Sequence, residues 1–349
     1  MFEYIGALHI HSVYSDGSGE VKEIAQHANE SGLDFMILTD HNTLRALDEG
    51  FEGWYGNTLL LVGCEINDKE NKNHYIALGI EETFSTRIPA KEYVRRVKEA
   101  GGIGFLAHPH EKRCSMKEHP AYPWTEWSSE DFTCIEIWNH MSEWMEGLTE
   151  QNKYNYFLHP LKSISAPPTE TLKVWDQLNL KRKVVGIGGV DAHAHKINIL
   201  GFVELEIFPY KILFKSIRTH VLVEDRLNNS TELHEINSAK KQILKALEEG
   251  KCFISNFYHG DAKGFRFFAK EGNNNYQMGD SVPLTNDIQL IVAAPKENAI
   301  IRLIKDGKEI TSQEGSILEF FVKEIGAYRV EVFINQNAWI FSNHIRIGL

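Results

Sequence analysis

The larger, N-terminal part of the chain, up to about residue 225, alternates short continuous apolar runs with amphipathic stretches. Apolar residues at helical spacing predict helices over residues 21–31, 44–50 and 89–100. The apolar runs between them do not alternate with polar residues, which is typical of parallel strands that are covered on both faces. About seven such strand and helix units in one chain favour a closed barrel over an open sheet.

The pattern changes near residue 252. A last amphipathic helix is expected from Ala239 to Glu249, after a surface loop over residues 227–238. The runs that follow mostly alternate, and Asp306-Gly307 between two of them is a two-residue hairpin signal. This region is predicted to form an antiparallel β-sandwich of about 90 residues.

The length of 349 residues is enough for one large domain and a smaller one. We therefore predict a barrel domain over residues 1–251 and a sandwich domain over residues 252–349. The sandwich region contains no cluster of ligand-type residues, so we expect it to have a structural or substrate-covering role.

Histidines and carboxylates fall at the ends of the apolar runs. His9 and His11 lie two residues apart on the first expected strand, so their side chains should project to the same side. The carboxyl-terminal ends of barrel strands converge on one mouth, where residues distant in sequence meet. The strand-end candidates are His9, His11, Asp16, Asp40, His41, Glu65, His74, His108, Asp191 and His193.

These side chains are typical metal ligands. Imidazole and carboxylate together suit Zn²⁺, Mn²⁺ or Fe²⁺, whereas Ca²⁺ and Mg²⁺ sites use almost only oxygen. The candidates outnumber the three or four ligands of a single catalytic zinc ion, so we predict two to three divalent ions that share a bridging carboxylate. Ions about 3.5–4 Å apart can bind an oxyanion and generate hydroxide from bound water near neutral pH.

The order of the motifs carries a family resemblance. The chain contains H-x-H (9–11), S-D-G (15–17), T-D-H-N (39–42), a strand-end Glu, A-H-P (107–109) and D-A-H (191–193). Over about residues 5–225 it resembles the PHP (polymerase and histidinol phosphatase) superfamily. The resemblance implies a distorted (β/α)7 barrel with a trinuclear metal centre at its mouth.

The same resemblance implies how the ligands are divided. One ion would be held by His9, His11, Glu65 and Asp191, a second by Glu65, His74 and His108, and a third by Asp16, His41 and His193. Asp40 would orient a ligand. Apart from the resemblance, His195 lies two residues after His193 and could be a general acid or a substrate ligand. These two residues are the catalytic candidates.

Other polar residues near the strand ends are candidates for substrate binding. They are Arg45, His110, Asn139 and His140. Cations that follow the motifs, such as Lys112, Arg113 and Lys196, could also hold a phosphate.

Two kinds of hydrolysis remain open. The first is hydrolysis of a small phosphate ester through a metal-bound hydroxide at a di- or trinuclear centre. The second is hydrolysis of a carbamate, ester or amide bond, because the whole chain resembles the CehA/McbA-type subgroup. A phosphatase should direct cations at the metals, and an acyl hydrolase should offer an apolar slot, for which Trp138 and Trp144 are candidates. A non-catalytic metal-binding protein is a third interpretation.

The composition limits the classes of partner that we expect the protein to bind. The net charge of −11 disfavours binding to nucleic acid or an anionic membrane surface. No apolar run approaches the roughly 20 residues that span a bilayer, and the first residues lack the features of a secretory signal. The four scattered cysteines indicate neither a disulfide framework nor a zinc ribbon. We expect a cytoplasmic enzyme with a small-molecule substrate, and the oligomeric state stays open.

Overall fold

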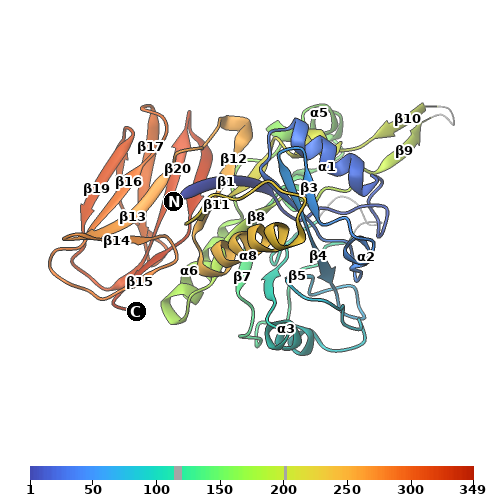
Figure 1. Ribbon diagram of the computed structural model, residues 1–349. Coiled ribbons are helices and arrows are strands. Elements are labelled where there is room, and N and C mark those ends of the chain that lie inside the picture. The colour runs from blue at the N-terminus through green and yellow to red at the C-terminus, as the bar shows by residue number, and fades with distance from the viewer. Residues whose placement is uncertain (114–119, 200–202) are drawn as a thin grey trace.

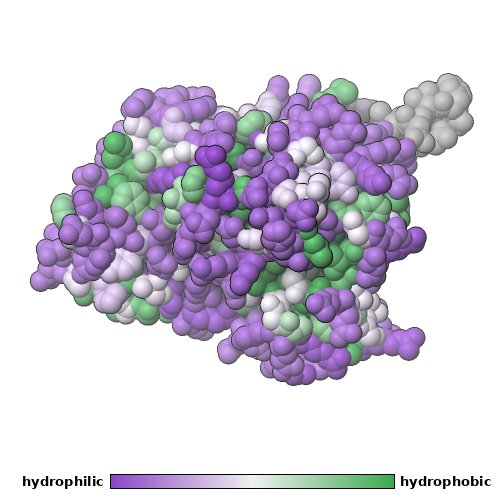
Figure 2. Space-filling model, in the orientation of Figure 1, coloured by the Kyte–Doolittle hydropathy of each residue, from purple (hydrophilic) through white to green (hydrophobic). Residues whose placement is uncertain are grey.

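The computed structural model describes residues 1–113, 120–199 and 203–349. Figure 1 shows two parts side by side, a mixed α/β part with all the long helices and a β part formed by the C-terminal strands. On the face drawn in Figure 2, hydrophilic residues cover most of the surface and apolar residues are scattered among them. Within the described residues, no helix has the length and apolar character needed to cross a bilayer.

Seven strands form the barrel wall. They are β1 (Phe2–Ala7), β2 (Phe35–Leu38), β4 (Thr58–Ile66), β5 (Tyr75–Leu78), β6 (Ile103–Leu106), β7 (Cys134–Asn139) and β8 (Val185–Gly189), and they neighbour one another in that order. Strand β5 is antiparallel to both of its neighbours, whereas the other pairs are parallel. The expected parallel direction is therefore wrong at β5. Residues 67–74, between β4 and β5, are too few for a crossover to a parallel strand, which takes about a dozen or more.

The barrel closes between the segments that follow β8 and β1. The Val190 amide donates to the Leu8 carbonyl at 2.9 Å, and the His11 amide donates to the Ala192 carbonyl at 2.9 Å. The Ala192 amide in turn donates to the His9 carbonyl at 3.2 Å. The distorted (β/α)7 barrel is thus confirmed, and its closure places the H-x-H and D-A-H motifs side by side.

The helices cover the outside of the barrel and its mouth. They are α1 (Val21–Glu30), α2 (Arg45–Asp48), α3 (Ala90–Glu99), α4 (His140–Gly147), α5 (Lys153–Leu158), α6 (Thr169–Lys181), α7 (Tyr210–Leu213) and α8 (Leu233–Glu249), with 3₁₀ turns η1 (Pro160–Lys162) and η2 (Phe257–His259). The three helices predicted in the first hundred residues are confirmed, with slightly shifted ends.

Helix α8 starts earlier than predicted. The expected surface loop over residues 227–238 is wrong from Leu233 onward. Ile236 packs against the barrel core one helical turn before Ala239, so the apolar stripe begins inside the polar stretch that suggested a loop.

A continuous sheet joins the two parts of the chain. The other strands of the α/β part are β3 (Gly53–Tyr55), β9 (Lys196–Ile199), β10 (Val203–Glu206), β11 (Ile217–Val223) and β12 (Cys252–Asn256). Strand β11 is antiparallel to β1 and β12, and β12 is antiparallel to β21 (Asn337–Ser342) of the C-terminal part. The domain boundary at residue 251 stays a prediction. It falls directly before a strand that is hydrogen-bonded to both parts.

The C-terminal part packs two mainly antiparallel sheets face to face. Its other strands are β13 (Arg266–Glu271), β14 (Asn274–Gln277), β15 (Ser281–Val282), β16 (Gln289–Ala293), β17 (Ala299–Lys305), β18 (Lys308–Glu314), β19 (Ile317–Phe321), β20 (Gly326–Ile334) and β22 (Ile345–Ile347). Phe267 and Val292 from one sheet share a buried core with Ile301 and Val330 from the other. Asp306-Gly307 forms the predicted β17–β18 hairpin, with φ of 53° and 80° at its two residues.

A buried ion pair ties α6 to the sandwich. The Arg329 guanidinium donates to both carboxylate oxygens of Asp176, at 2.7 and 3.0 Å, and His344 lies 2.8 Å from the same carboxylate. Burial opposes the charge on Asp176, but His344 and Arg329 outweigh it and lower the pKa of Asp176 to about 2. Both members of the pair are almost fully buried, so neither charge can be solvated if the other is lost.

We expect Asp176→Asn to lower the free energy of unfolding by about 3 kcal/mol, because it removes the bidentate partner of the buried Arg329 guanidinium and leaves Glu331 as its remaining carboxylate. Urea denaturation measures this loss. The matched control is Asp131→Asn, which removes an exposed ion pair with Lys98 and should cost less than about 1 kcal/mol. Equal losses in the two variants would contradict the role of the buried pair.

Candidate metal centre

The backbone at the barrel mouth is bent into unusual conformations where candidate ligands lie. His9, His108 and Asp191 have positive φ values of 66°, 29° and 53°. Such values cost about 1–3 kcal/mol for residues other than glycine, and they concentrate at functional sites. His9 and His11 therefore do not lie on a regular strand as predicted, because β1 ends at Ala7. Their rings still meet, with centroids 5.1 Å apart.

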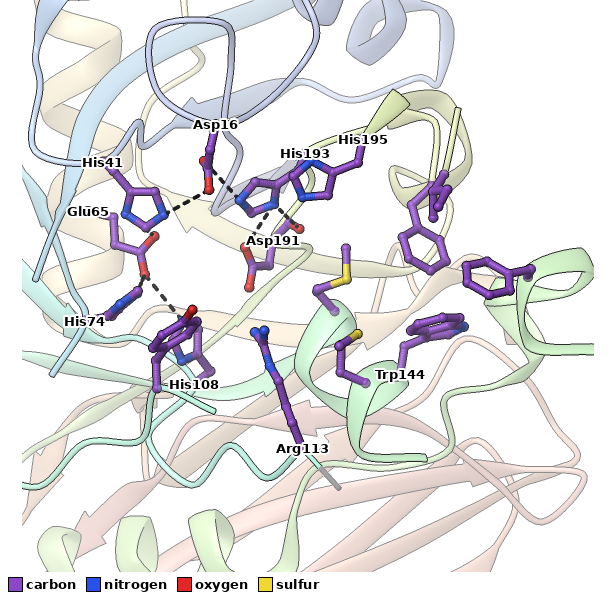
Figure 3. Close-up of a pocket in the computed structure, with 16 residues that line it drawn as sticks. Asp16, His41, Glu65, His74, His108, Arg113, Trp144, Asp191, His193 and His195 are labelled. Atoms are coloured by element: carbon purple, nitrogen blue, oxygen red, sulfur yellow. Dashed lines mark hydrogen bonds and ion pairs between the residues drawn. The ribbon is translucent and has the colours of Figure 1, made fainter. Parts of the chain in front are cut away.

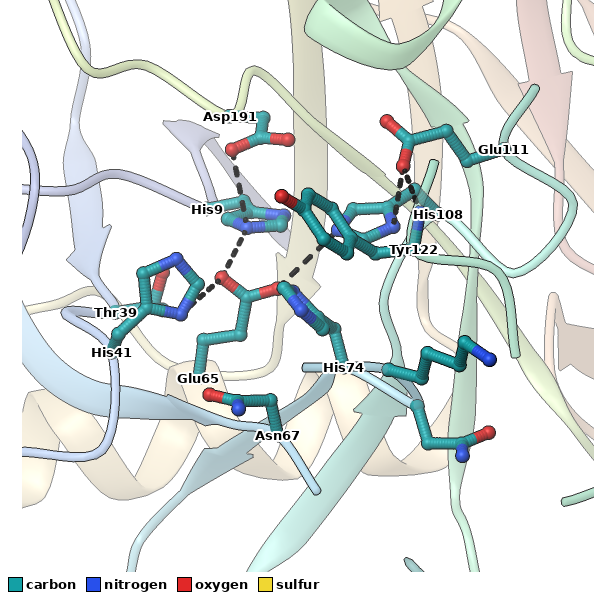
Figure 4. Close-up of polar contacts among 12 residues, drawn as sticks. His9, Thr39, His41, Glu65, Asn67, His74, His108, Glu111, Tyr122 and Asp191 are labelled. Carbon is teal, nitrogen blue, oxygen red and sulfur yellow. Dashed lines mark hydrogen bonds and ion pairs between the residues drawn. The ribbon is translucent and has the colours of Figure 1, made fainter. Parts of the chain in front are cut away.

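The carboxylate of Glu65, at the end of β4, is the centre of the cluster (Figure 4). Its side chain is 1% exposed, so the charge is compensated by protein groups rather than by bulk water. Five imidazoles surround it, with nitrogen to oxygen distances of 3.1 Å from His9, 3.2 Å from His11, 3.4 Å from His41, 2.8 Å from His74 and 3.4 Å from His108.

Two more carboxylates complete the cluster. Asp191 Oδ1 lies 3.4 Å from His9 Nε2, 3.5 Å from His11 Nε2 and 3.5 Å from His193 Nδ1. Asp16 is half exposed, and its carboxylate lies 3.2 Å from His193 and 3.7 Å from both His11 and His41. All nine predicted metal ligands are thus brought together.

The residues fit divalent metal ions. Four groups of side chains could each place their ligand atoms within 4.8 Å of one another: His11, Asp16, His41 and His193; His9, Glu65 and His108; His9, His11 and Asp191; and His41, Glu65 and His74. Among the described residues, both ring nitrogens of His11 and one each of His41, His74 and His108 are buried without a hydrogen-bond partner. Buried polar atoms are rarely left unpaired, and a coordinated cation would satisfy these nitrogens.

Burial and neighbouring charges shift the pKa values of the side chains in the cluster. Burial disfavours the charge on Glu65, but His9 and His41 hold its pKa well below the usual range. Burial likewise opposes a charged His11, yet the neighbouring carboxylates raise its pKa to about 10. At His41 burial dominates and lowers the pKa to about 4. Metal ions bind neutral imidazole, so metal uptake must displace protons from groups such as His11.

The cluster forms one end of a pocket with a volume of about 210 Å³ (Figure 3). Arg113 and Tyr122 also line it, and the guanidinium of Arg113 reaches toward the space between His108 and Trp144. His195 lies in the pocket beside His193, with ring centroids 5.0 Å apart. The opposite end is apolar and is lined by Met141, Trp144, Met145, Phe157, Ile207 and Phe208.

Known protein families and structures were compared with this chain. Residues 7–105 match the PHP domain family. This region is a PHP domain. An uncharacterized protein of Methanocaldococcus jannaschii is 29% identical over 120 residues, which cover 31% of this chain and 68% of that protein.

Two further proteins are similar to the chain. A phosphoribosyl 1,2-cyclic phosphate 1,2-diphosphodiesterase of Eggerthella lenta is 30% identical over 80 residues, which cover 22% of this chain and only 30% of that enzyme. A crystal structure from Bacteroides vulgatus, described as a two-domain protein containing a predicted PHP-like metal-dependent phosphoesterase, aligns with 99% of this chain and 95% of its own. Its sequence identity is 15% and its TM-score is 0.44.

The first catalytic candidate, Asp40, is buried and does not line the pocket. Its carboxylate accepts hydrogen bonds from the Ser12 amide at 2.7 Å, the Ser12 hydroxyl at 2.7 Å and the Ser15 hydroxyl at 2.6 Å. These bonds hold the loop that carries Asp16. Asp40 is therefore a positioning residue, whereas the second candidate, His195, does face the pocket.

Two of the four predicted substrate-binding residues point away from the pocket. Arg45, on α2, is exposed and pairs with Glu49 at 2.6 Å. His110 is turned toward Thr171, with Nδ1 3.0 Å from its hydroxyl, and stacks on Trp127. The structure brings neither residue to the wall of this pocket, and their roles in substrate binding stay predictions.

The other two substrate candidates are buried behind the site. Asn139 donates to Glu136 at 2.9 Å and to Asp191 at 3.3 Å, and its side-chain oxygen caps α4. His140 is fully buried against Phe208, and burial lowers its pKa to about 3. Neither residue lines the pocket, and their roles in substrate binding stay predictions.

The sequence analysis missed Glu136, a buried carboxylate in the middle of β7. One of its oxygens lies 3.0 Å from His9 Nδ1, and the other accepts a hydrogen bond from the His108 amide at 2.8 Å. A Cβ at Gly189 would lie 1.9 Å from this carboxylate, so only glycine leaves room for it. A charged residue inside the otherwise apolar run CIEIWN was the signal that could have revealed it.

The structure predicts unequal roles for two acidic ligands. Glu65→Gln should remove more bound metal than Asp16→Asn, because Glu65 faces five imidazoles and Asp16 only three. Elemental analysis after reconstitution and dialysis measures the loss. Glu52→Gln, outside the cluster and paired with Lys240, is the control that should keep its metal. Equal losses in the two ligand variants would contradict the central position of Glu65.

A separate prediction concerns Glu136. Glu136→Gln should weaken metal binding by about 10- to 100-fold, because it removes the charge that orients His9. Competition with a coloured chelator measures the affinity. Glu143→Gln, which changes a carboxylate bonded to Trp138 and Ser165, should leave the affinity unchanged. An unchanged affinity in Glu136→Gln would contradict the assignment.

Proposed function

We propose that this protein is a metal-dependent phosphoesterase that hydrolyses a small phosphate ester at a di- or trinuclear centre. The observation that carries the proposal is the buried Glu65 carboxylate, shared by five imidazoles in a pocket that also contains the Arg113 guanidinium. The donor set suits divalent ions, and a guanidinium beside it suits an anionic substrate. The PHP domain and the diphosphodiesterase from Eggerthella lenta support a phosphate ester.

Three sets of residues would hold the ions. In the proposed arrangement they are His9, His11, Glu65 and Asp191; Glu65, His74 and His108; and Asp16, His41 and His193. The ligand-atom groups contain the whole third set and, from the first set, His9, His11 and Asp191 without Glu65. Glu65 groups with His9 and His108, and again with His41 and His74. Zinc, manganese or iron suits this mixture of nitrogen and oxygen ligands.

Besides the metal ions, three parts of the pocket would contribute to the reaction: Arg113, His195 and the apolar end. When bound, divalent ions of this kind polarise a phosphoryl oxygen and lower the pKa of bound water toward about 7. Arg113 donates to a phosphoryl oxygen, and Glu111 holds its guanidinium in place through Nε and Nη2 at 2.8 and 2.6 Å. His195, at the open side of the cluster, protonates the leaving oxygen. The apolar end excludes water from the reacting groups.

A specific observation favours the second candidate function, hydrolysis of a carbamate, ester or amide bond. The apolar slot expected of an acyl hydrolase is present, and Trp144 lines it. Trp138 does not line the slot, since it is buried against Phe341 and donates to Glu143 at 2.6 Å.

The CehA/McbA-type subgroup stays a prediction. The cytoplasmic location, the small-molecule partner and the absence of a nucleic-acid partner also stay predictions.

The metal-loaded protein should hydrolyse phosphate esters in a panel that also contains carbamates, anilides and carboxylic esters. A chelator should abolish the activity, and divalent metal should restore it. In a single turnover in ¹⁸O-labelled water, the label should enter the released phosphate. Label found only in a carboxylate product, without phosphatase activity across the panel, would move the assignment to the second function.

Arg113 provides the matching variant test. Arg113→Gln should lower kcat/KM for phosphate esters by about 100-fold, because one preorganised donor to the developing negative charge is lost. Arg45→Gln, which removes an exposed arginine paired with Glu49, should leave the rate unchanged.

A further inference from the structure

The apolar end of the pocket is built largely by one face of helix α4. Met141, Trp144 and Met145 lie at positions i, i+3 and i+4, so their side chains form one stripe that lines the pocket. Phe157 from α5 and Ile207 and Phe208 from the segment after β10 complete the wall. Figure 3 shows Trp144 across the pocket from His41 and Glu65, on the far side of Arg113.

The side chains of this wall are apolar, apart from the indole N–H of Trp144. The Trp144 ring meets Phe208 edge to face at a centroid distance of 4.5 Å and lies 5.1 Å from Phe157. Its indole N–H donates to the Tyr156 carbonyl at 3.2 Å, so that donor is already used. A hydroxyl-rich group such as a sugar would lose its bonds to water at this wall and gain none in return, which is costly.

The residue types of the wall and the size of the pocket favour an aromatic ring as the bound group. Thioether sulfur contacts aromatic rings favourably, and clustered aromatic rings offer edge-to-face partners. An apolar cavity of about 150 Å³ is enough to hold benzene. The whole pocket measures about 210 Å³, which suits a single ring joined to a phosphoryl group rather than a fused polycyclic group.

We propose that the leaving group of the ester is a compact, single-ring aromatic alcohol that is seated against Trp144. The inference rests on the proposed function and names its substrate class. The oxygen of water bonds to phosphorus, the bond between phosphorus and the ester oxygen breaks, and that oxygen leaves with a proton as the aromatic alcohol. Arg113 contacts the phosphoryl group between the two ends of the pocket.

Benzyl phosphate and ethyl phosphate test the proposal, because their leaving alcohols have similar basicity and differ mainly in the ring. We expect kcat/KM for benzyl phosphate to be at least about tenfold higher, since even one methylene in an apolar pocket is worth about tenfold or more. Trp144→Ala should reduce this ratio toward one. Trp127→Ala is the matched control, because Trp127 stacks on His110 outside the pocket, and it should leave the ratio unchanged.

Binding measurements keep this test separate from the test of the reaction. Calorimetry of the wild-type, metal-loaded protein should show tighter binding of benzylphosphonate than of ethylphosphonate, by about tenfold or more. Hydrolysis of both esters at equal rates, or faster hydrolysis of a sugar phosphate, would overturn the aromatic leaving group and leave the phosphoesterase intact. If no phosphate ester is hydrolysed, the proposed function fails. Equal binding of the two phosphonates would then overturn the aromatic site as well.

Discussion

The site depends on the compensation of one buried negative charge, the carboxylate of Glu65. Removing a carboxylate from water costs several kcal/mol, so it persists only where opposite charges or strong donors surround it. The imidazoles that do so follow β1, β2 and β6 or precede β5, so the strands beside β4 bring residues distant in sequence around Glu65. Barrel closure adds Asp191 and His193 to the same cluster. The same charge also keeps the imidazoles together.

A second buried layer holds this centre from behind. Glu136 binds the ring of His9 and the backbone of His108, and both of these residues have positive φ. The strain at these residues is maintained because their neighbours leave them no alternative conformation. Gly189 belongs to the same layer, since its missing side chain is the space that Glu136 fills. Groups behind metal ligands fix their orientation, and this layer is arranged to do so.

Helix α4 connects the chemistry of the centre to the recognition of the substrate. Asn139 caps its first turn and bonds Asp191 and Glu136, so the helix begins at the metal cluster. One turn further on, its apolar stripe forms the wall around Trp144. A single short helix thus sets the distance between the polar and apolar ends of the pocket. The pocket accordingly combines features that the sequence had assigned to competing functions, a cation for phosphate and an apolar slot.

Local sequence determined the elements of this protein and the chemistry of its strand ends. Continuous apolar runs and the histidines and carboxylates that follow them are short-range patterns, and all nine predicted metal ligands gather as expected. The direction of β5 follows from the short connection before it, a local signal that the pattern of apolar runs did not use. Tertiary structure alone decided the orientation of Arg45 and His110, because loops set where a side chain points after its strand ends. It alone also turned Phe157 and Phe208 toward the pocket. Nothing local distinguishes such residues from core residues, since which apolar faces remain uncovered depends on contacts between segments that are distant in sequence.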